Sequence, residues 1–444
     1  MLICSIICLS TYYCKYTADW DSLDSRPLPS WYGEAKIGIF IHWGLYSVPA
    51  FHSEWFWYYW KAEGRPEFDE FVRKTYGDNF KYADFAPMFK ASRFNSSYWA
   101  DLFADSGAKY VVLTSKHHEG FALWPSNYSW MWNSVDVGPH IDIVGALSKA
   151  TRTRDIKFGV YYSLYEWFNP WYMCDTCQDF EFGEKKAFNE LKHLVETYTP
   201  DVIWSDGDWE KNDTYWKSKE FLAYLYNDSP VKDTVVVNDR WGIGTYCTHG
   251  GFWNCEDHYI PNSTLNHKWE NAFSLDKKSW GYRADIKSNE VMSIEDLIKE
   301  TVISVSMNGN VLINVGPSSE GIIPAIMEDR LRSLGAWLKI NGRAIYNSRI
   351  VSFSSNDCLQ RNSWFTRTNQ SLYIICTDIQ VIHQDVILFG SIPENVYIRS
   401  ISLLGCPQLE VTWNRYKSVT SIYIPENACL HTLKWAFVLS IAEI

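Results

Sequence analysis

Val202-Ile-Trp-Ser-Asp206-Gly-Asp208-Trp209 is a short apolar run that stops at two acidic residues separated by a glycine. Its length and composition predict a buried β-strand. Further short apolar runs lie before and after it, with helical stretches between them. The predicted strands are residues 36–42, 110–115, 158–163, 202–205, 235–238 and 311–315, with two shorter ones at 251–254 and 279–282.

Helical periodicity is clear at Glu184–Tyr198, Ile294–Val305 and Ala325–Ile340. Alternation of strands and helices predicts a parallel sheet. Eight strands favour a closed (β/α)8-type TIM barrel over an open doubly wound sheet. No Gly-x-Gly-x-x-Gly turn follows the first strand, which disfavours a dinucleotide site.

After about residue 345 the helical pattern stops and short strands with turn residues between them follow. These are predicted at Ser371–Thr377, Val386–Phe389, Asn395–Ser402, Glu410–Trp413 and Ser421–Ile424. They predict a C-terminal all-β sandwich. The expected division is a signal-peptide region at 1–19, a catalytic barrel at 20–345 and the β-sandwich at 346–444.

The composition is that of a globular chain: of 444 residues, 46% are hydrophobic and 21% are charged. A net charge of −11 argues against a nucleic-acid partner, which calls for a basic surface. Aromatic residues make up 17%, including 23 Trp and 28 Tyr. Such rings stack on the apolar faces of sugars, although a large core would also use them.

Several features point to export. Residues 1–10 resemble the apolar core of a secretory signal, although no Lys or Arg precedes them, and a mis-started reading frame would give the same pattern. No later run is long enough to span a membrane. Six Asn-x-Ser/Thr sequons start at Asn95, Asn127, Asn212, Asn227, Asn262 and Asn369, and Asn227 has a poor context because Pro230 follows its Ser. Lysosomal or secreted localisation is therefore expected.

The cysteine count fits an exported chain. Beyond the signal region there are eight cysteines: Cys174, Cys177, Cys247, Cys255, Cys358, Cys376, Cys406 and Cys429. Disulfides are expected, and their pairing stays open. Cys174-Asp-Thr-Cys177 is interpreted as a short-loop disulfide rather than half of a zinc site, because no second close Cys-x-x-Cys accompanies it.

Ionisable or hydroxyl side chains follow the predicted strands one after another. Barrel enzymes carry their catalytic groups at the carboxyl ends of their strands. Any one such residue is ordinary, but a polar group at successive strand ends is not. The segments concerned are His42-Trp43, Lys116-His-His-Glu119, Tyr161-Tyr-Ser163, Asp206-Gly-Asp208, Asn238-Asp-Arg240 and Cys255-Glu-Asp257.

Three histidines raise the alternative of a metal hydrolase. His42, His117 and His118 could each supply a ligand. Adjacent residues of an extended segment point to opposite faces, so His117 and His118 are not expected to share one ion. We therefore interpret these histidines as hydrogen-bond partners of a sugar and expect neither metal nor cofactor.

These motifs resemble glycoside hydrolase family 29, the α-L-fucosidases, over about residues 20–345 and most closely its animal lysosomal branch. The resemblance rests on ordered segments. They are Trp31–Pro49 with Ser53-Glu-Trp55, Lys116–Phe121, Trp204–Gly207, Val236–Gly242, Cys255–Asp257, Lys268–Glu270, Ser279–Arg283 and Asn310–Pro317. One segment departs from the family: Leu265 falls one residue late after Pro261, and Ala272 stands where the family has a Cys.

The resemblance implies a retaining exo-α-L-fucosidase that acts on fucosylated glycans with Asp206 as its nucleophile. It implies that the fucose ring is held by His42, Glu54, Trp55, His117, His118, Tyr162, Arg240 and Trp280. Three carboxyls compete as general acid: Asp257 is placed first, Glu270 second and Glu256 third. Asp257 and Glu256 follow a strand, whereas Glu270 is assigned to a loop.

Two alternatives remain beside the hydrolase. The first is a catalytically weakened fucose-binding protein on the same scaffold, which only the altered segment around Ala272 supports. The second is the metal hydrolase, which the missing ligand spacing opposes. Linkage preference stays open, and so does assembly into a homo-oligomer.

Overall fold

Seven parallel strands form the central sheet of the computed structural model. The structure describes residues 15–174, 182–351, 363–377, 387–389, 392, 396–416, 419–424 and 435–443. The strands are β1 (Ile37–Ile41), β2 (Tyr110–Lys116), β3 (Lys157–Ser163), β4 (Val202–Asp206), β5 (Val236–Val237), β6 (Trp269–Ser274) and β7 (Gly309–Val315). Their order across the sheet is β5-β4-β3-β2-β1-β7-β6. Each strand is buried almost throughout, as expected when helices cover a parallel sheet.

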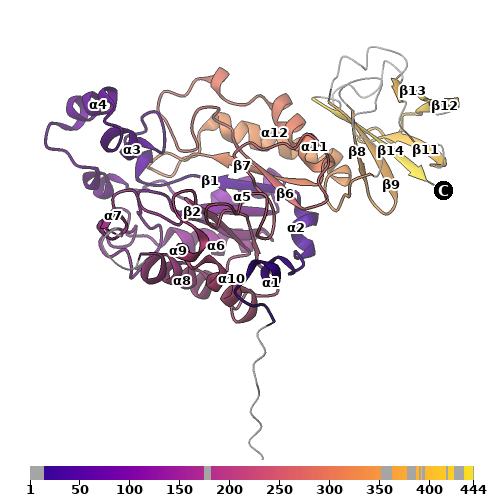
Figure 1. Cartoon of the computed structure of the whole chain (residues 1–444). Helices are drawn as coiled ribbons and strands as arrows, with labels where there is room; N and C mark the ends of the chain where they lie inside the picture. The colour runs from indigo at the N-terminus through magenta and orange to yellow at the C-terminus, as the bar shows by residue number, and fades with distance from the viewer. Residues whose placement is uncertain are drawn as a thin grey trace, which may run out of the picture.

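Within the described residues, helices lie between consecutive strands of this sheet except β5 and β6, and they surround the sheet (Figure 1). They are α1 (Trp20–Asp24), α2 (Ser30–Ala35), α3 (Phe56–Lys61), α4 (Pro66–Tyr76), α5 (Ser96–Asp105), α6 (Ile143–Arg152), α7 (Pro170–Cys174), α8 (Phe188–Tyr198), α9 (Asp213–Trp216), α10 (Ser218–Asn227), α11 (Ile294–Ser306) and α12 (Ala325–Asn341). Shorter turns are η1 (Leu45–Ser47), η2 (Tyr82–Met88), η3 (Phe182–Ala187), η4 (Ser288–Glu290) and η5 (Gly342–Ala344). Ser293 caps α11, because its hydroxyl accepts a hydrogen bond from the Asp296 amide at 3.0 Å.

Six of the eight predicted strands are confirmed, and those at 251–254 and 279–282 are not. Glu270, which was assigned to a loop, lies in β6. The inward residues of β6 include Glu270, so the strand lacks the apolar pattern by which the others were found.

The segment at 251–254 lies between β5 and β6 without becoming a regular strand. The Phe252 amide donates to the Val237 carbonyl at 3.0 Å, and the Trp253 amide donates to the Lys268 carbonyl at 2.9 Å. The Glu270 amide in turn donates to the Trp253 carbonyl at 2.8 Å. Main-chain hydrogen bonds therefore connect the two edge strands of the curled sheet.

The C-terminal part consists of antiparallel strands in two sheets. One sheet has the order β10 (Ile387–Phe389), β13 (Val419–Tyr423), β12 (Thr412–Tyr416). The other has the order β11 (Ile398–Leu403), β14 (Phe437–Glu443), β9 (Ser371–Cys376), β8 (Ser363–Arg367). Ile422 of the first sheet and Leu439 of the second belong to one buried apolar cluster.

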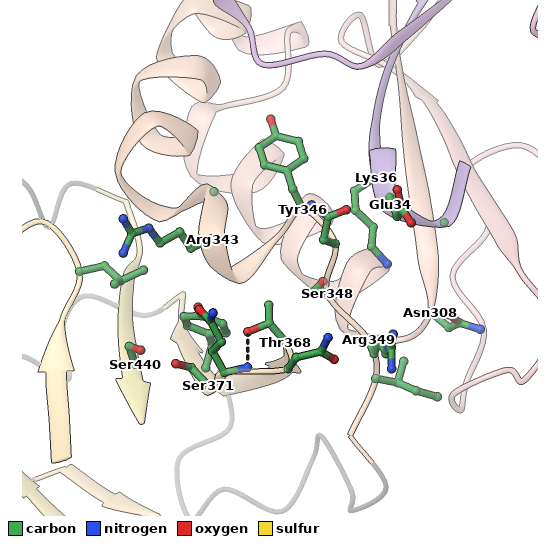
Figure 2. A pocket seen from close by; sticks show the side chains of 18 of the residues that line it. Glu34, Lys36, Asn308, Arg343, Tyr346, Ser348, Arg349, Thr368, Ser371 and Ser440 are labelled. Atoms are coloured by element: carbon green, nitrogen blue, oxygen red, sulfur yellow. Dashed lines mark hydrogen bonds between the residues drawn. The ribbon is translucent and has the colours of Figure 1, made fainter. Parts of the chain in front are cut away.

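This C-terminal part packs against α11 and α12 of the larger part (Figure 1). The buried Trp337 of α12 donates its indole N–H to the Ala436 carbonyl at 2.9 Å. A polar cavity of about 1270 Å³ also lies where the two parts meet. Figure 2 shows Lys36 and Glu34 on one of its walls and Ser371 and Ser440 on another. No residue proposed for catalysis lines this cavity.

The export features have mixed outcomes. Cys247 and Cys255 form a disulfide, and Cys406 is disulfide-bonded as well. Cys177 lies outside the described residues, as do Cys358, Cys429 and residues 1–14 of the expected signal region. Among the described residues, no helix has both the length and the apolar character needed to cross a membrane.

Candidate active site

The carboxyl ends of the parallel strands meet around one small pocket. Side chains from β1, β3 and β4 and from the loops after β1, β2, β4, β5 and β6 reach it. Its lining residues are Phe40, His42, Glu54, Trp55, His117, His118, Tyr161, Trp204, Asp206, Trp209, Arg240, Asp257 and Trp280. Nine of the twelve residues singled out from sequence line this pocket; the three that do not are Tyr162, Glu256 and Glu270. The structure thus brings most of the predicted site together.

Asp206 is the last residue of β4 and points into the pocket. Its Oδ2 accepts a hydrogen bond from the Tyr161 hydroxyl at 2.7 Å, and its Oδ1 accepts one from Arg240 at 3.0 Å. Gly207 then turns the chain with φ +73, and a Cβ there would lie 2.5 Å from the Tyr165 ring. The glycine after Asp206 is therefore needed both for the turn and for the close approach.

Arg240 connects the two leading carboxyls. Its Nη1 donates to Asp206, and its Nη2 donates to Asp257 Oδ1 at 2.6 Å. The guanidinium is buried and lies 4.7 Å from the centre of the Trp204 ring. One planar cation thus fixes a buried carboxylate and a half-exposed one side by side.

Glu270 lies elsewhere, although it was placed second as general acid. It stands in β6 and is fully buried. Its carboxylate accepts hydrogen bonds from Tyr32 at 2.7 Å, Tyr110 at 2.6 Å and the Trp204 indole at 2.9 Å. Burial raises its pKa. With its oxygens engaged by these donors and no contact with the pocket, Glu270 has no route to a sugar oxygen.

Glu256 is also outside the pocket: it is exposed at the surface and is not among the residues that line the pocket. Of the three competing carboxyls, Asp257 is the one that lines the pocket.

Tyr162 is not a pocket residue either. Its hydroxyl donates to Glu190 at 2.8 Å and accepts from Lys116 at 2.9 Å, in a buried ionic cluster behind the strand. Tyr161 takes its place. In the parallel register Tyr161 pairs with Trp204, and Ser163 pairs with Asp206, so these four residues share one face of the sheet. The register was the signal that could have distinguished the two tyrosines.

The three histidines do meet at the pocket, contrary to the argument from an extended chain. The rings of His117 and His118 are 4.1 Å apart, because both follow β2 in a turn instead of continuing the strand. His42 Nδ1 donates to the Asn314 side-chain oxygen at 2.8 Å, and His118 Nδ1 is hydrogen-bonded to the Ser163 hydroxyl at 2.7 Å. Burial lowers the pKa of His42 and His118 well below the usual value, so both are neutral.

The ligand atoms of these histidines do not form a metal-binding group. Among the described residues, the set that brings three potential ligand atoms within 4.8 Å of one another is Asp239, Cys247 and Cys255. Its two cysteines are joined as a disulfide. The residues present therefore do not fit a metal centre of the kind considered from sequence.

Glu54 and Trp280 are linked across the pocket rim. Glu54 Oε2 accepts from the amides of Trp280 at 3.0 Å and Gly281 at 3.1 Å. Asn314 of β7 donates to the Trp280 carbonyl at 2.8 Å and also holds His42. Trp55 and Trp209 stack nearly parallel with ring centres 6.2 Å apart. The pocket thus has aromatic walls that alternate with polar groups, as sugar sites have.

Besides Tyr161, two residues at or beside the pocket were not singled out from sequence. Asn314 orients both His42 and Trp280, although it lay inside a recognised motif. Asp208 is fully buried beside the pocket, and burial together with the charge of Asp206 raises its pKa to about 7. Its Oδ1 accepts from the Tyr246 hydroxyl at 3.1 Å. Nothing in a single sequence indicates that an Asp after a glycine is buried.

Comparison with known proteins agrees with this geometry. The family model described as α-L-fucosidase matches residues 4–343. This chain belongs to the α-L-fucosidase family. It is 53% identical to human tissue α-L-fucosidase over 81% of this chain and 78% of that protein. It is 45% identical to rat plasma α-L-fucosidase over 100% of this chain and 99% of that protein.

A solved α-L-fucosidase has the same architecture. The enzyme of Thermotoga maritima in complex with a mechanism-based inhibitor superposes with a TM-score of 0.83 at 33% identity. The match covers 96% of this chain and 100% of that one. The resemblance inferred from motifs is therefore confirmed along nearly the whole chain.

Proposed function

We propose that this chain is a retaining exo-α-L-fucosidase that releases terminal α-L-fucose from glycoproteins, glycolipids or oligosaccharides. The observation that carries the proposal is the Asp206–Arg240–Asp257 arrangement at the mouth of the pocket. Retaining glycosidases need a nucleophile and an acid/base carboxyl about 5–5.5 Å apart. A guanidinium that binds both carboxyls keeps them close while it separates their charges.

Asp206 is proposed as the nucleophile and Asp257 as the acid/base. In the first step Asp206 attacks the anomeric carbon while Asp257 protonates the leaving oxygen. In the second step Asp257 takes a proton from water, which displaces Asp206. The burial of Asp206 supports its role as nucleophile. The partial exposure of Asp257 supports its role as acid/base, because that residue must contact both the leaving group and water.

The remaining pocket residues are proposed to bind fucose. His42, His117 and His118 offer imidazole nitrogens to ring hydroxyls, and Glu54 braces the Trp280 loop. Trp55, Trp209 and Trp280 provide apolar surface for the sugar face and for the methyl group that fucose carries in place of a 6-hydroxyl.

We further propose that the sheet closes into a (β/α)8-type barrel, with the main chain at 251–254 filling the gap between β5 and β6. The two C-terminal sheets are proposed to form a β-sandwich, with the boundary near residue 345. A signal region at 1–19 and a lysosomal or secreted destination complete the proposal, and the tissue and plasma relatives support it.

The function is tested on purified protein with an aryl α-L-fucoside, with an aryl β-D-galactoside as control. We expect hydrolysis of the fucoside alone, and NMR of the early product should show α-fucose first. Asp206→Asn should lower kcat by roughly 10⁴-fold or more while the fold is retained, since a lost nucleophile has no substitute. Appearance of β-fucose first would overturn the double displacement.

The acid/base is tested through the leaving group. Asp257→Ala should lower cleavage of a fucosyl-galactose bond by about 10²- to 10⁴-fold, the usual contribution of general acid catalysis. Dinitrophenyl fucoside needs no protonation and should lose far less in its first step. Azide should then speed the second step and yield fucosyl azide. If Glu256→Ala behaves this way and Asp257→Ala does not, the assignment is wrong.

A further inference from the structure

Asp257 lies on a short arch between two sharply turned residues. Cys255 has φ +56 and His258 has φ +54, both in the left-handed region. A residue other than glycine is strained in such a sparsely populated conformation and persists there only where its surroundings fix it. Glu256 and Asp257 between them are exposed. The position of Asp257 therefore depends on how both ends of the arch are anchored.

The far end of the arch is held by β6 and α11. The His258 amide donates to the Ala272 carbonyl at 2.7 Å. Its imidazole lies 3.4 Å from Glu300, whose carboxylate raises the pKa of His258.

The near end is held by the Cys247–Cys255 disulfide and by Asp239. Asp239 is fully buried and directly precedes Arg240. Its Oδ2 accepts from the amides of Cys247 at 2.9 Å and Cys255 at 3.1 Å. Its Oδ1 accepts from the Asn254 amide at 3.0 Å. One carboxylate thus binds the main chain at both ends of the disulfide loop.

We propose that Asp239 and the Cys247–Cys255 disulfide form a clamp that positions Asp257 against Arg240 for proton transfer. Asp239 and Arg240 are consecutive, so the residue that fixes the arch lies directly beside the residue that receives Asp257. The clamp is a positioning device, since neither Asp239 nor the disulfide lines the pocket. The inference rests on the proposed role of Asp257 as acid/base.

A positioning role predicts a selective defect. Loss of the clamp leaves Asp206, Arg240 and the sugar-binding groups in place and displaces only the acid/base. Cleavage that needs a proton on the leaving oxygen should suffer, and cleavage of an activated fucoside should not. A merely structural role would lower both together.

The test compares Asp239→Asn and the double variant Cys247→Ser/Cys255→Ser with the wild type. The matched control is Thr248→Ala, an exposed residue inside the same disulfide loop. Each protein is assayed by kcat/KM on a fucosyl-galactose disaccharide and on dinitrophenyl fucoside. We expect a loss of at least about 10-fold on the disaccharide in both clamp variants, less than about threefold on the activated substrate, and no change in the control.

The outcomes separate the hypotheses. Equal losses on both substrates, or no loss on either, would overturn the clamp. If the double cysteine variant does not fold, Asp239→Asn alone decides, because it keeps the disulfide and replaces only one acceptor oxygen. A wild-type protein that cleaves neither fucoside would instead refute the proposed function. Azide rescue of the clamp variants would further tie the defect to Asp257.

Discussion

Neighbouring tyrosines in β3 have opposite surroundings. The Tyr161 hydroxyl donates to Asp206, whereas the Tyr162 hydroxyl belongs to the buried cluster of Lys116 and Glu190. Both residues are equally buried and equally aromatic, so composition does not distinguish them. Only the alternation of side chains along the strand assigns one to the pocket and the other to the helix-covered face.

This difference predicts two separable phenotypes. Tyr161→Phe removes a hydrogen bond to a charged group, worth about 1.5–3 kcal/mol, and should lower kcat/KM by roughly 10- to 100-fold with little change in stability. Tyr162→Phe should leave kcat/KM nearly unchanged but lower the free energy of unfolding by about 1–3 kcal/mol. Steady-state kinetics and urea unfolding of both variants check this. The reverse pattern would mean that the assignment of the two faces is wrong.

Individual residues of the site were predictable from sequence where they end or directly follow a regular strand. Asp206 and His42 end or directly follow apolar strands, so their place at the strand ends could be inferred from sequence. His117 and His118 could not be oriented, because the argument assumed an extended chain where there is a turn. Glu270 was misplaced because three aromatic donors satisfy it inside the sheet, and no local pattern indicates partners so distant in sequence.

Among the elements, the apolar strands of the central sheet were predictable, and the strand with polar inward residues was not. The observed β1, β2, β3 and β4 begin and end within one residue of the predicted runs. In contrast, β6 carries Glu270 and Asn271, whose polar groups are hydrogen-bonded in the interior. The strands β8 and β14 of the C-terminal sheets were also missed. A strand such as β6, whose polar side chains find partners only in the assembled fold, gives no periodic signal; this does not account for β14, which is mostly apolar.

The contact of α12 with β14 leads to a prediction about this helix. Trp337 is 2% exposed and donates to the Ala436 carbonyl, so it fills the space where the helix meets the C-terminal strands. Trp337→Ala should lower the free energy of unfolding by about 3–5 kcal/mol through the cavity it leaves. Activity of the folded variant should change little, because Trp337 does not line the pocket at the carboxyl ends of the parallel strands.

Denaturant unfolding checks the effect, and Trp130→Ala provides the control. Trp130 is 81% exposed, so its removal should change the unfolding free energy by less than about 0.5 kcal/mol. Equal effects of the two substitutions would contradict the packing role of Trp337.

For the whole molecule, the two-part organisation was predictable but the contact between the parts was not. The change from helical periodicity to short strands placed the boundary near residue 345. Nothing in that change shows that Trp337 faces Ala436 or that a polar cavity opens beside them. Such contacts join residues about a hundred positions apart, and a single sequence holds no record of which surfaces meet.

The pH dependence of stability is also a property of the whole molecule, because buried groups act in opposite directions. Burial raises the pKa of Asp208, Asp239 and Glu270, so each contributes stability that is lost as the pH rises. Burial lowers the pKa of His42 and His118, so stability is lost as the pH falls below their usual value of about 6.5. At Glu190 burial is outweighed by Lys186 and Lys116, which lower its pKa, so its contribution is lost in acid. The measured dependence of the unfolding free energy on pH is the sum of these contributions. A substitution at one of these residues isolates the contribution of that residue.

The substitution Asp208→Asn isolates the carboxyl with a raised pKa beside Asp206, the proposed nucleophile. The unfolded pKa of an Asp is about 3.9, and that of Asp208 in the folded protein is about 7. Between these values the folded protein binds a proton that the unfolded chain releases, so wild-type stability falls relative to the variant as the pH rises. The variant-minus-wild-type difference in unfolding free energy should therefore increase by at most about 1.4 kcal/mol per pH unit between about pH 4 and 7, and stay level outside that range.

Unfolding free energies of both proteins from pH 3.5 to 8 measure this, and a constant difference would show that Asp208 is not protonated in the folded molecule. A buried proton lost near pH 7 would favour the folded enzyme in acid, which agrees with the proposed lysosomal destination.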